Sequence, residues 1–126
     1  MTIISGREMK KAERRFAERI VITGAKVHYK LENGETGTAR IENLTKNSIC
    51  IQLQQRVLNG QAIDLDLIIP DKPVISVKAR IVWVLPRGSY AAGSNVGIQF
   101  RPFGDEVKNN PLKTAQQMEK IIHEYQ

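Results

Sequence analysis

Residues 74–85, VISVKARIVWVL, are the longest stretch of the chain in which apolar residues recur at every second position. This period of two is typical of a β-strand that turns one face toward a core. The stretch therefore predicts one long strand with a buried face. Its in-phase residues are Ile75, Val77, Ala79, Ile81, Trp83 and Leu85.

Five shorter stretches alternate in the same way, at residues 21–31, 37–41, 49–54, 62–69 and 95–101. In the first of them the phase predicts that Val21 is buried together with Ala25, Val27, Tyr29 and Leu31. Asn33-Gly34 is a strong hairpin signal, because both residues tolerate positive φ. Short connections without an intervening helix indicate antiparallel pairing. We predict an all-β fold, a six-stranded antiparallel β-barrel, because closure removes exposed sheet edges.

The C-terminal residues follow a different pattern. Asn110 is a suitable N-cap, and Pro111 then occupies the first helical position. Apolar residues at helical spacing predict an amphipathic helix over residues 109–125, with the face Ala115, Met118, Ile122 and Tyr125. Packing on the barrel is the favoured interpretation, and packing on a partner is the alternative. The predicted organisation is a single domain: a basic N-terminal arm (1–19), a barrel (20–103) and this helix.

The chain of 126 residues carries a formal net charge of +6, and basic residues are concentrated between Arg7 and Lys30. Such a local excess indicates an anionic partner, although a solvated basic arm is an equally good interpretation. No apolar run is long enough to span a membrane, and the N-terminus lacks the pattern of a signal peptide. The single cysteine, Cys50, excludes an internal disulfide. We expect a cytoplasmic protein.

Catalytic and metal-binding patterns are missing from the sequence. His28 and His123 have no acidic partner nearby in the chain, and we expect both at the surface. Asp64 and Asp66 share one face of a strand but are too few for a calcium cage. Nothing near Cys50 suggests a lowered thiol pKa. We predict that the protein is not an enzyme and holds no metal.

Three stretches occur together in an informative order. Residues 13–19, ERRFAER, place Arg15 and Arg19 in an RxxxR motif that is preceded by Arg14. Residues 43–48, NLTKNS, follow at the end of the second predicted strand. ARIVWV (79–84) and VGIQF (96–100) come last. Over roughly residues 13–103 the sequence resembles the PilZ domain family, whose members bind the bacterial second messenger cyclic di-GMP.

The resemblance implies a cyclic di-GMP ligand, without any further cofactor. It implies that Arg15 and Arg19, supported by Arg14, contact guanine and phosphate, because a guanidinium donates paired hydrogen bonds to both. It also implies that Asn43 and Thr45 contact the ligand. In some relatives a tryptophan at the position of Trp83 stacks near a guanine, whereas the strand phase here favours its burial.

Ser48 departs from the family pattern, which has glycine at this position. The expected reason for the glycine is either a positive φ or a close approach of the backbone to the ligand. A side chain at positive φ costs roughly 1–2 kcal/mol, which would weaken binding about tenfold or more. Asn47 is the residue that would take over a left-handed turn.

The leading functional hypothesis is a cyclic di-GMP receptor that relays binding to a protein partner. The alternative is a PilZ-fold adaptor of motility or pilus machinery that does not bind cyclic di-GMP. A nucleic-acid-binding barrel is permitted by the basic charge, but the strands offer few exposed aromatic residues for stacking on bases. We therefore expect neither DNA nor RNA as a partner.

Overall fold

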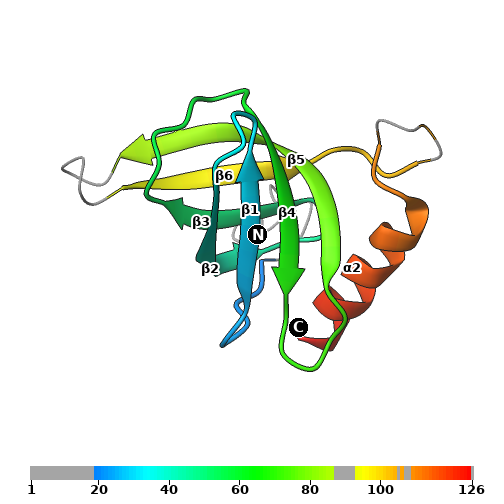
Figure 1. The fold of residues 1–126 in the computed structure, drawn as a ribbon. Helices are drawn as coiled ribbons and strands as arrows, with labels where there is room; N and C mark the ends of the chain where they lie inside the picture. The colour runs from blue at the N-terminus through cyan, green and yellow to red at the C-terminus, as the bar shows by residue number, and fades with distance from the viewer. Residues whose placement is uncertain (1–18, 87–92, 105, 107–108, 126) are drawn as a thin grey trace, which may run out of the picture.

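The computed structural model describes residues 19–86, 93–104, 106 and 109–125. Six strands and one helix follow one another: β1 (Lys26–Leu31), β2 (Thr36–Leu44), β3 (Ser48–Leu53), β4 (Ala62–Ile68), β5 (Ile75–Pro86), β6 (Ser94–Phe100) and α2 (Leu112–Glu124). The strands close into a barrel in the order β1-β2-β3-β6-β5-β4, and every neighbouring pair is antiparallel (Figure 1). The predicted fold class is confirmed.

Burial of alternate side chains holds the barrel together. Along β4 the residues Ile63, Leu65 and Leu67 are buried, while Asp64 and Asp66 are exposed. β1 and β3 alternate in the same way, and every strand contributes buried apolar residues to one interior. Apolar burial is worth roughly 25 cal/mol per Å². A slip by one residue in any strand would turn its apolar row to solvent, and the core therefore fixes the register.

The alternation of β5 changes phase after Ile81. A β-bulge between Ile81 and Trp83 inserts an extra residue opposite β6. Trp83 is 44% exposed and Leu85 is 59% exposed, so the predicted burial of both residues is wrong. The physical reason is that a bulge shifts every following residue by one position, which a period of two cannot anticipate.

The segment before β1 also departs from the predicted phase. Val21 is 72% exposed, whereas Ile20 and Ile22 are buried. A turn at Thr23 and Gly24, with Gly24 at φ 83°, separates this segment from β1 and resets the alternation. The backbone of Ile20 exchanges two hydrogen bonds with Leu44, each 2.9 Å long. The chain before β1 is therefore tied to the end of β2.

Asn110 does not cap the helix, contrary to the prediction. The helix begins at Leu112, and Pro111 in the capping position makes no side-chain hydrogen bond. Asn110 is instead 1% exposed and fastens the connection to the barrel. Its Oδ1 accepts from the Lys78 amide at 2.7 Å, and its Nδ2 donates to the carbonyls of Lys78 (3.0 Å) and Arg101 (2.9 Å).

The helix α2 lies beside the β5 end of the barrel (Figure 1). Its buried residues are Thr114, Met118, Ile121 and Ile122, of which the last three belong to the core. The predicted face is thus correct at Met118 and Ile122, but Ala115 is only half-buried and Tyr125 is exposed. At its C-terminal end Glu124 binds the ammonium of Lys72 with both carboxylate oxygens, at 2.6 and 2.7 Å.

Replacing Asn110 with alanine should destabilise the fold. The substitution leaves a buried amide and two carbonyls without their side-chain partner, at about 1–3 kcal/mol for each such group. We expect Asn110→Ala to lower the free energy of unfolding in urea by about 2–4 kcal/mol. Asn109→Ala, at the half-exposed neighbour, should change it by less than about 0.5 kcal/mol. Equal urea midpoints for the two variants would show that the hydrogen bonds of Asn110 do not stabilise the fold.

Candidate functional site

Four strands present a continuous outer face on which predicted site residues meet. Strand pairing sets Asn43 of β2 opposite Cys50 of β3, Cys50 opposite Gly97 of β6, and Gly97 opposite Trp83 of β5. A parallel row runs from Ser48 through Gln99 to Arg80. These two rows form what we call the outer platform: Asn43, Ser48, Cys50, Arg80, Trp83, Gly97 and Gln99.

The turn between β2 and β3 is built around Thr45. Its amide donates to the Ser48 carbonyl at 2.8 Å. Its Oγ1 accepts from the amides of Asn47 (3.1 Å) and Ser48 (3.0 Å), and it lies 2.9 Å from the Ser48 hydroxyl. Thr45 is only 6% exposed. The two amide hydrogens occupy both lone pairs of Thr45 Oγ1, so the Thr45 hydroxyl donates its proton to the Ser48 oxygen. The Ser48 hydroxyl proton then points away from Thr45.

Ser48 occupies an ordinary strand position. It begins β3 and pairs with Gln99. Among the described residues, Asp71 at φ 64° is the only one other than glycine with a positive φ. The expected left-handed strain at Ser48 is therefore absent, and Asn47 does not take over a left-handed turn. Of the two expected reasons for a glycine here, only a close approach of backbone and ligand remains.

Arg19 reaches the outer platform from the start of the described chain. The antiparallel bridge between Ile20 and Leu44 runs Arg19 toward Thr45. Arg19 is exposed, and its charge acts on the thiol of Cys50. Arg14 and Arg15 lie outside the described residues. The structure thus brings Arg19, Asn43, Thr45 and Ser48 to one end of the platform.

Trp83 lies at the other end of the same row, with its indole over Gly97. A Cβ on Gly97 would overlap the indole atoms Nε1, Cε2 and Cδ1. Gly97 therefore makes room for the ring, as expected for an aromatic residue that covers a glycine on the neighbouring strand. Because Trp83 is 44% exposed, part of the indole remains accessible to a stacking partner.

Cys50 lies between these two ends of the row, and the charges around it shift the pKa of its thiol. Burial raises the pKa of its thiol, the Glu42 carboxylate raises this pKa further, and the Arg19 guanidinium lowers it. The two charged residues therefore lie close to Cys50. Neither the thiol nor its neighbours resemble a nucleophilic site, which needs a lowered thiol pKa. The described residues contain no cluster of three or more histidine, cysteine or acidic residues that could hold a metal.

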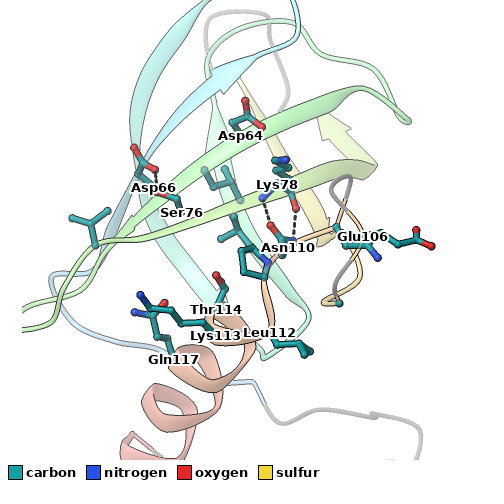
Figure 2. Close-up of a pocket in the computed structure, with 16 residues that line it drawn as sticks. Asp64, Asp66, Ser76, Lys78, Glu106, Asn110, Leu112, Lys113, Thr114 and Gln117 are labelled. Atoms are coloured by element: carbon teal, nitrogen blue, oxygen red, sulfur yellow. Dashed lines mark hydrogen bonds between the residues drawn. The ribbon is translucent and has the colours of Figure 1, made fainter.

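A separate cleft lies between the outer face of β4–β5 and the start of α2 (Figure 2). Its volume is about 930 Å³, and it is lined by both acidic and basic side chains, including Asp64, Asp66, Lys78 and Lys113. Figure 2 shows Asn110 bonded to Lys78 at its edge and Asp66 accepting from Ser76. Mixed charge favours no single sign of ligand, and none of the predicted site residues that the structure describes lines this cleft.

Sequence reasoning assigned no binding role to four residues of the platform: Cys50, Arg80, Gly97 and Gln99. Arg80 lies inside ARIVWV, and Gly97 and Gln99 lie inside VGIQF, two stretches that carry the family resemblance but had no assigned contact with the ligand. Only the register between distant strands places them beside Ser48 and Trp83. Strand register also places His28 of β1 opposite Asp66 of β4. The Nδ1 atom of His28 lies 2.7 Å from the Thr38 hydroxyl.

The fold is a small closed β-barrel whose outer platform carries Arg80 and lies beside Arg19. A family model described as "PilZ domain" matches residues 13–113. The chain therefore belongs to the PilZ domain family, and PilZ domains are non-catalytic receptors of cyclic di-GMP. No curated protein matches the sequence at a significant level.

Solved structures share this fold at low sequence identity. The PilZ domain of YcgR from Escherichia coli with c-di-GMP has a TM-score of 0.67 and 15% identity, and the match covers 89% of this chain and 91% of that one. MotI from Bacillus subtilis, an inhibitor of motility, has a TM-score of 0.64 and 13% identity, over 88% and 50% of the two chains. The MrkH–c-di-GMP complex of K. pneumonia has a TM-score of 0.60 and 14% identity, over 88% and 52%. The chain thus spans about half the length of the latter two.

No helix in the described part of the chain is long and apolar enough to cross a membrane.

The pH dependence of Cys50 alkylation should show whether Arg19 lies close to the thiol. Only the thiolate reacts with iodoacetamide, and Cys50 is the single cysteine. Arg19→Ala removes a charge that lowers the pKa of the thiol, so the midpoint of the pH–rate profile should move up. Glu42→Gln removes a charge that raises this pKa, so the midpoint should move down. Lys30→Ala, on β1, is the control and should leave it unchanged. Identical profiles for all four proteins would place Arg19 and Glu42 away from Cys50.

Proposed function

We propose that the protein is a cyclic di-GMP receptor that relays binding of this second messenger to a protein partner. The observation that carries the proposal is the convergence of Arg19, Asn43 and Ser48 at one end of the outer platform. Membership of the PilZ family supports the ligand class. The solved PilZ domain of YcgR and the MrkH complex both contain c-di-GMP.

The side chains of the platform suit the chemistry of the ligand. Cyclic di-GMP presents two phosphates and two guanines. A guanidinium donates paired hydrogen bonds to guanine O6 and N7 or to phosphate oxygens, so Arg15 and Arg19, with Arg14 in support, take these groups. The Asn43 amide and the Ser48 hydroxyl face the ligand from the barrel, and the Trp83 ring offers a stacking surface. Thr45 acts through the turn that it holds in place.

The same turn connects the site to the helix, which supports the relay. Lys46, between Thr45 and Asn47, lines a cleft of about 540 Å³ with Gln116, Glu119, Lys120 and His123 of α2. A ligand that shifts the turn changes the surface next to α2, and a partner that reads this surface prefers one of the two states. We propose that the receptor works in the cytoplasm.

Binding of cyclic di-GMP should depend on the two motif arginines. We expect titration calorimetry to show micromolar or tighter binding, and Arg15→Ala and Arg19→Ala each to weaken it by at least about tenfold, because a hydrogen bond to a charged group is worth about 1.5–3 kcal/mol. Lys26→Ala, on the outer face of β1, removes the same charge away from the site and should stay within about twofold. The ligand should also protect Cys50 from alkylation. The absence of heat at high micromolar ligand would exclude the receptor function.

A second candidate function is a PilZ-fold adaptor that does not bind the dinucleotide. The observation that favours it is the occupied hydroxyl of Thr45, which the turn itself consumes, together with the side chain of Ser48 at the motif's glycine position. The Ser48 side chain then blocks close approach of the ligand to the β3 backbone. In this case the outer platform contacts a protein.

Ser48→Gly separates the two candidates. A glycine removes the side chain from the platform without altering any left-handed turn, since Ser48 lies in a strand. If the adaptor is correct, the native chain gives no heat with cyclic di-GMP and Ser48→Gly restores micromolar binding. If the receptor is correct, both proteins bind, and their affinities differ by less than about tenfold. Ser76→Gly, on the outer face of β5, controls for the loss of a strand side chain.

A further inference from the structure

The strand β5 continues past the end of its partner β4. On the β4 side its last backbone bonds are made by Ile81, whose amide donates to the Gln61 carbonyl at 2.9 Å and whose carbonyl accepts from the Gly60 amide at 2.6 Å. Beyond Ile81, within the described part of the chain, β5 pairs with β6 alone. We call residues 82–86 the β5 edge, and in Figure 1 this end of β5 projects from the barrel together with the start of β6.

The free side of the β5 edge presents backbone groups of Val84. Residues along an antiparallel strand direct their amide and carbonyl alternately to one neighbouring strand and to the other. In β6 the Phe100 amide faces β3, where it donates to the Asn47 carbonyl at 2.8 Å, so Val96 faces β3 as well. Val84 pairs in register with Val96, and its amide and carbonyl therefore point away from β6. Among the described residues no strand is paired with β5 on that side of Val84.

The side chains of the β5 edge are apolar and exposed to solvent at Val82, Trp83 and Leu85. Leu58, which is also exposed, belongs to the turn that bonds to Ile81. These four residues are half of the eight large apolar residues that are exposed in the described part of the chain, so exposed apolar surface is concentrated here. An apolar strand edge with unpaired backbone groups is a template for pairing with another strand.

The β5 edge is complementary to a second copy of itself. Antiparallel pairing about a twofold axis at Val84 places the two Val84 residues opposite each other and each Trp83 opposite Leu85 of the second copy. The latter pair joins an aromatic and an aliphatic side chain, which is a favourable combination across strands. Residues 82–86, VWVLP, carry no charge, so self-pairing brings no like charges together. Pro86 cannot donate to a ladder and would end the pairing.

The area of this contact indicates a weak dimer. The exposed parts of Val82, Trp83 and Leu85 in two copies together amount to roughly 500 Å² of apolar surface. Complexes that bury less than about 1,200 Å² are typically transient. The edge therefore suits association that depends on protein concentration, and not an obligate dimer.

We propose that the β5 edge is an interaction surface that pairs edge to edge with a second copy of this chain. The resulting symmetric dimer joins the two barrels through one sheet that runs from β6 across both β5 strands to the second β6. The contact uses backbone and apolar groups and none of the motif arginines. It is therefore independent of the proposed receptor function, and a chain that does not bind cyclic di-GMP still dimerises.

The test is sedimentation velocity of the full chain from about 5 to about 500 µM, a range that suits a contact of this size. We expect the native chain to self-associate and Leu85→Asp to weaken the dimer at least about tenfold. Leu85→Thr keeps a β-branched strand former but loses the apolar contact, and it should weaken the dimer by a smaller factor. Leu112→Asp, on α2, is the matched control, because Leu112 is 51% exposed and Leu85 59%, and it should stay within about twofold.

Amide hydrogen exchange followed by NMR locates the contact. The Val84 amide should exchange several-fold more slowly at a concentration at which the dimer predominates than in the monomer. The Trp83 amide provides an internal control, because it faces Gly97 of β6 in either state and should be equally protected in both.

Two outcomes overturn the proposal. A native chain that stays monomeric over the whole range leaves the edge to a strand of another protein and excludes a second copy as the occupant. A dimer that leaves the exchange of the Val84 amide unchanged, or that Leu112→Asp weakens as much as Leu85→Asp, uses another surface. Because both leucines are exposed, thermal unfolding should be the same for all variants. If Leu85→Asp does not fold, Leu85→Thr and the exchange of the Val84 amide decide the question.

Discussion

The shared interior of the six strands is the constraint on which the rest of the structure depends. Each strand turns an apolar row inward, and the barrel closes only in the register that brings all rows together. The same register decides which outward residues become neighbours, because alternate side chains of one strand point to opposite faces. The apolar core therefore sets the outer platform without contributing a single side chain to it. Asn110 ties the connection before α2 to β5, and α2 adds Met118, Ile121 and Ile122 to the core.

Two irregularities in this register fall on one row of the platform. β2 has a bulge between Ile41 and Asn43, and β5 has a bulge between Ile81 and Trp83. Each inserts one residue and thereby turns a side chain outward, Asn43 at one end of the row and Trp83 at the other. A bulge interrupts the hydrogen-bonded ladder, so regular pairing would have been the simpler arrangement. Both outward side chains therefore lie on the row in which Asn43, Cys50, Gly97 and Trp83 are paired.

The candidate site was predictable where its residues form a local motif. RxxxR and NLTKNS can be found in the sequence because their members lie within a few positions of one another. Their structural roles were not predictable to the same degree. Thr45 was expected to contact a ligand, yet its buried hydroxyl is used by the turn. A positive φ at Ser48 was one of the two expected reasons for the family's glycine, and the strand conformation of Ser48 excludes it. Such roles depend on hydrogen bonds and backbone angles, which residue identity alone leaves open.

By itself the sequence determined the class of fold, the number of strands and the inward face of nearly every strand, because a period of two follows from strand geometry and needs no knowledge of the partner strands. It also determined the family through its ordered motifs. Only the tertiary structure decided that Trp83 is exposed, that Asn110 clamps β5 and that Cys50, Arg80 and Gln99 join the platform. These outcomes depend on the pairing of strands far apart in the chain and on two bulges in that pairing. A bulge shifts the alternation of buried and exposed residues by one position, and it forms through contacts between strands. The residue pattern of a single strand therefore does not reveal where a bulge occurs.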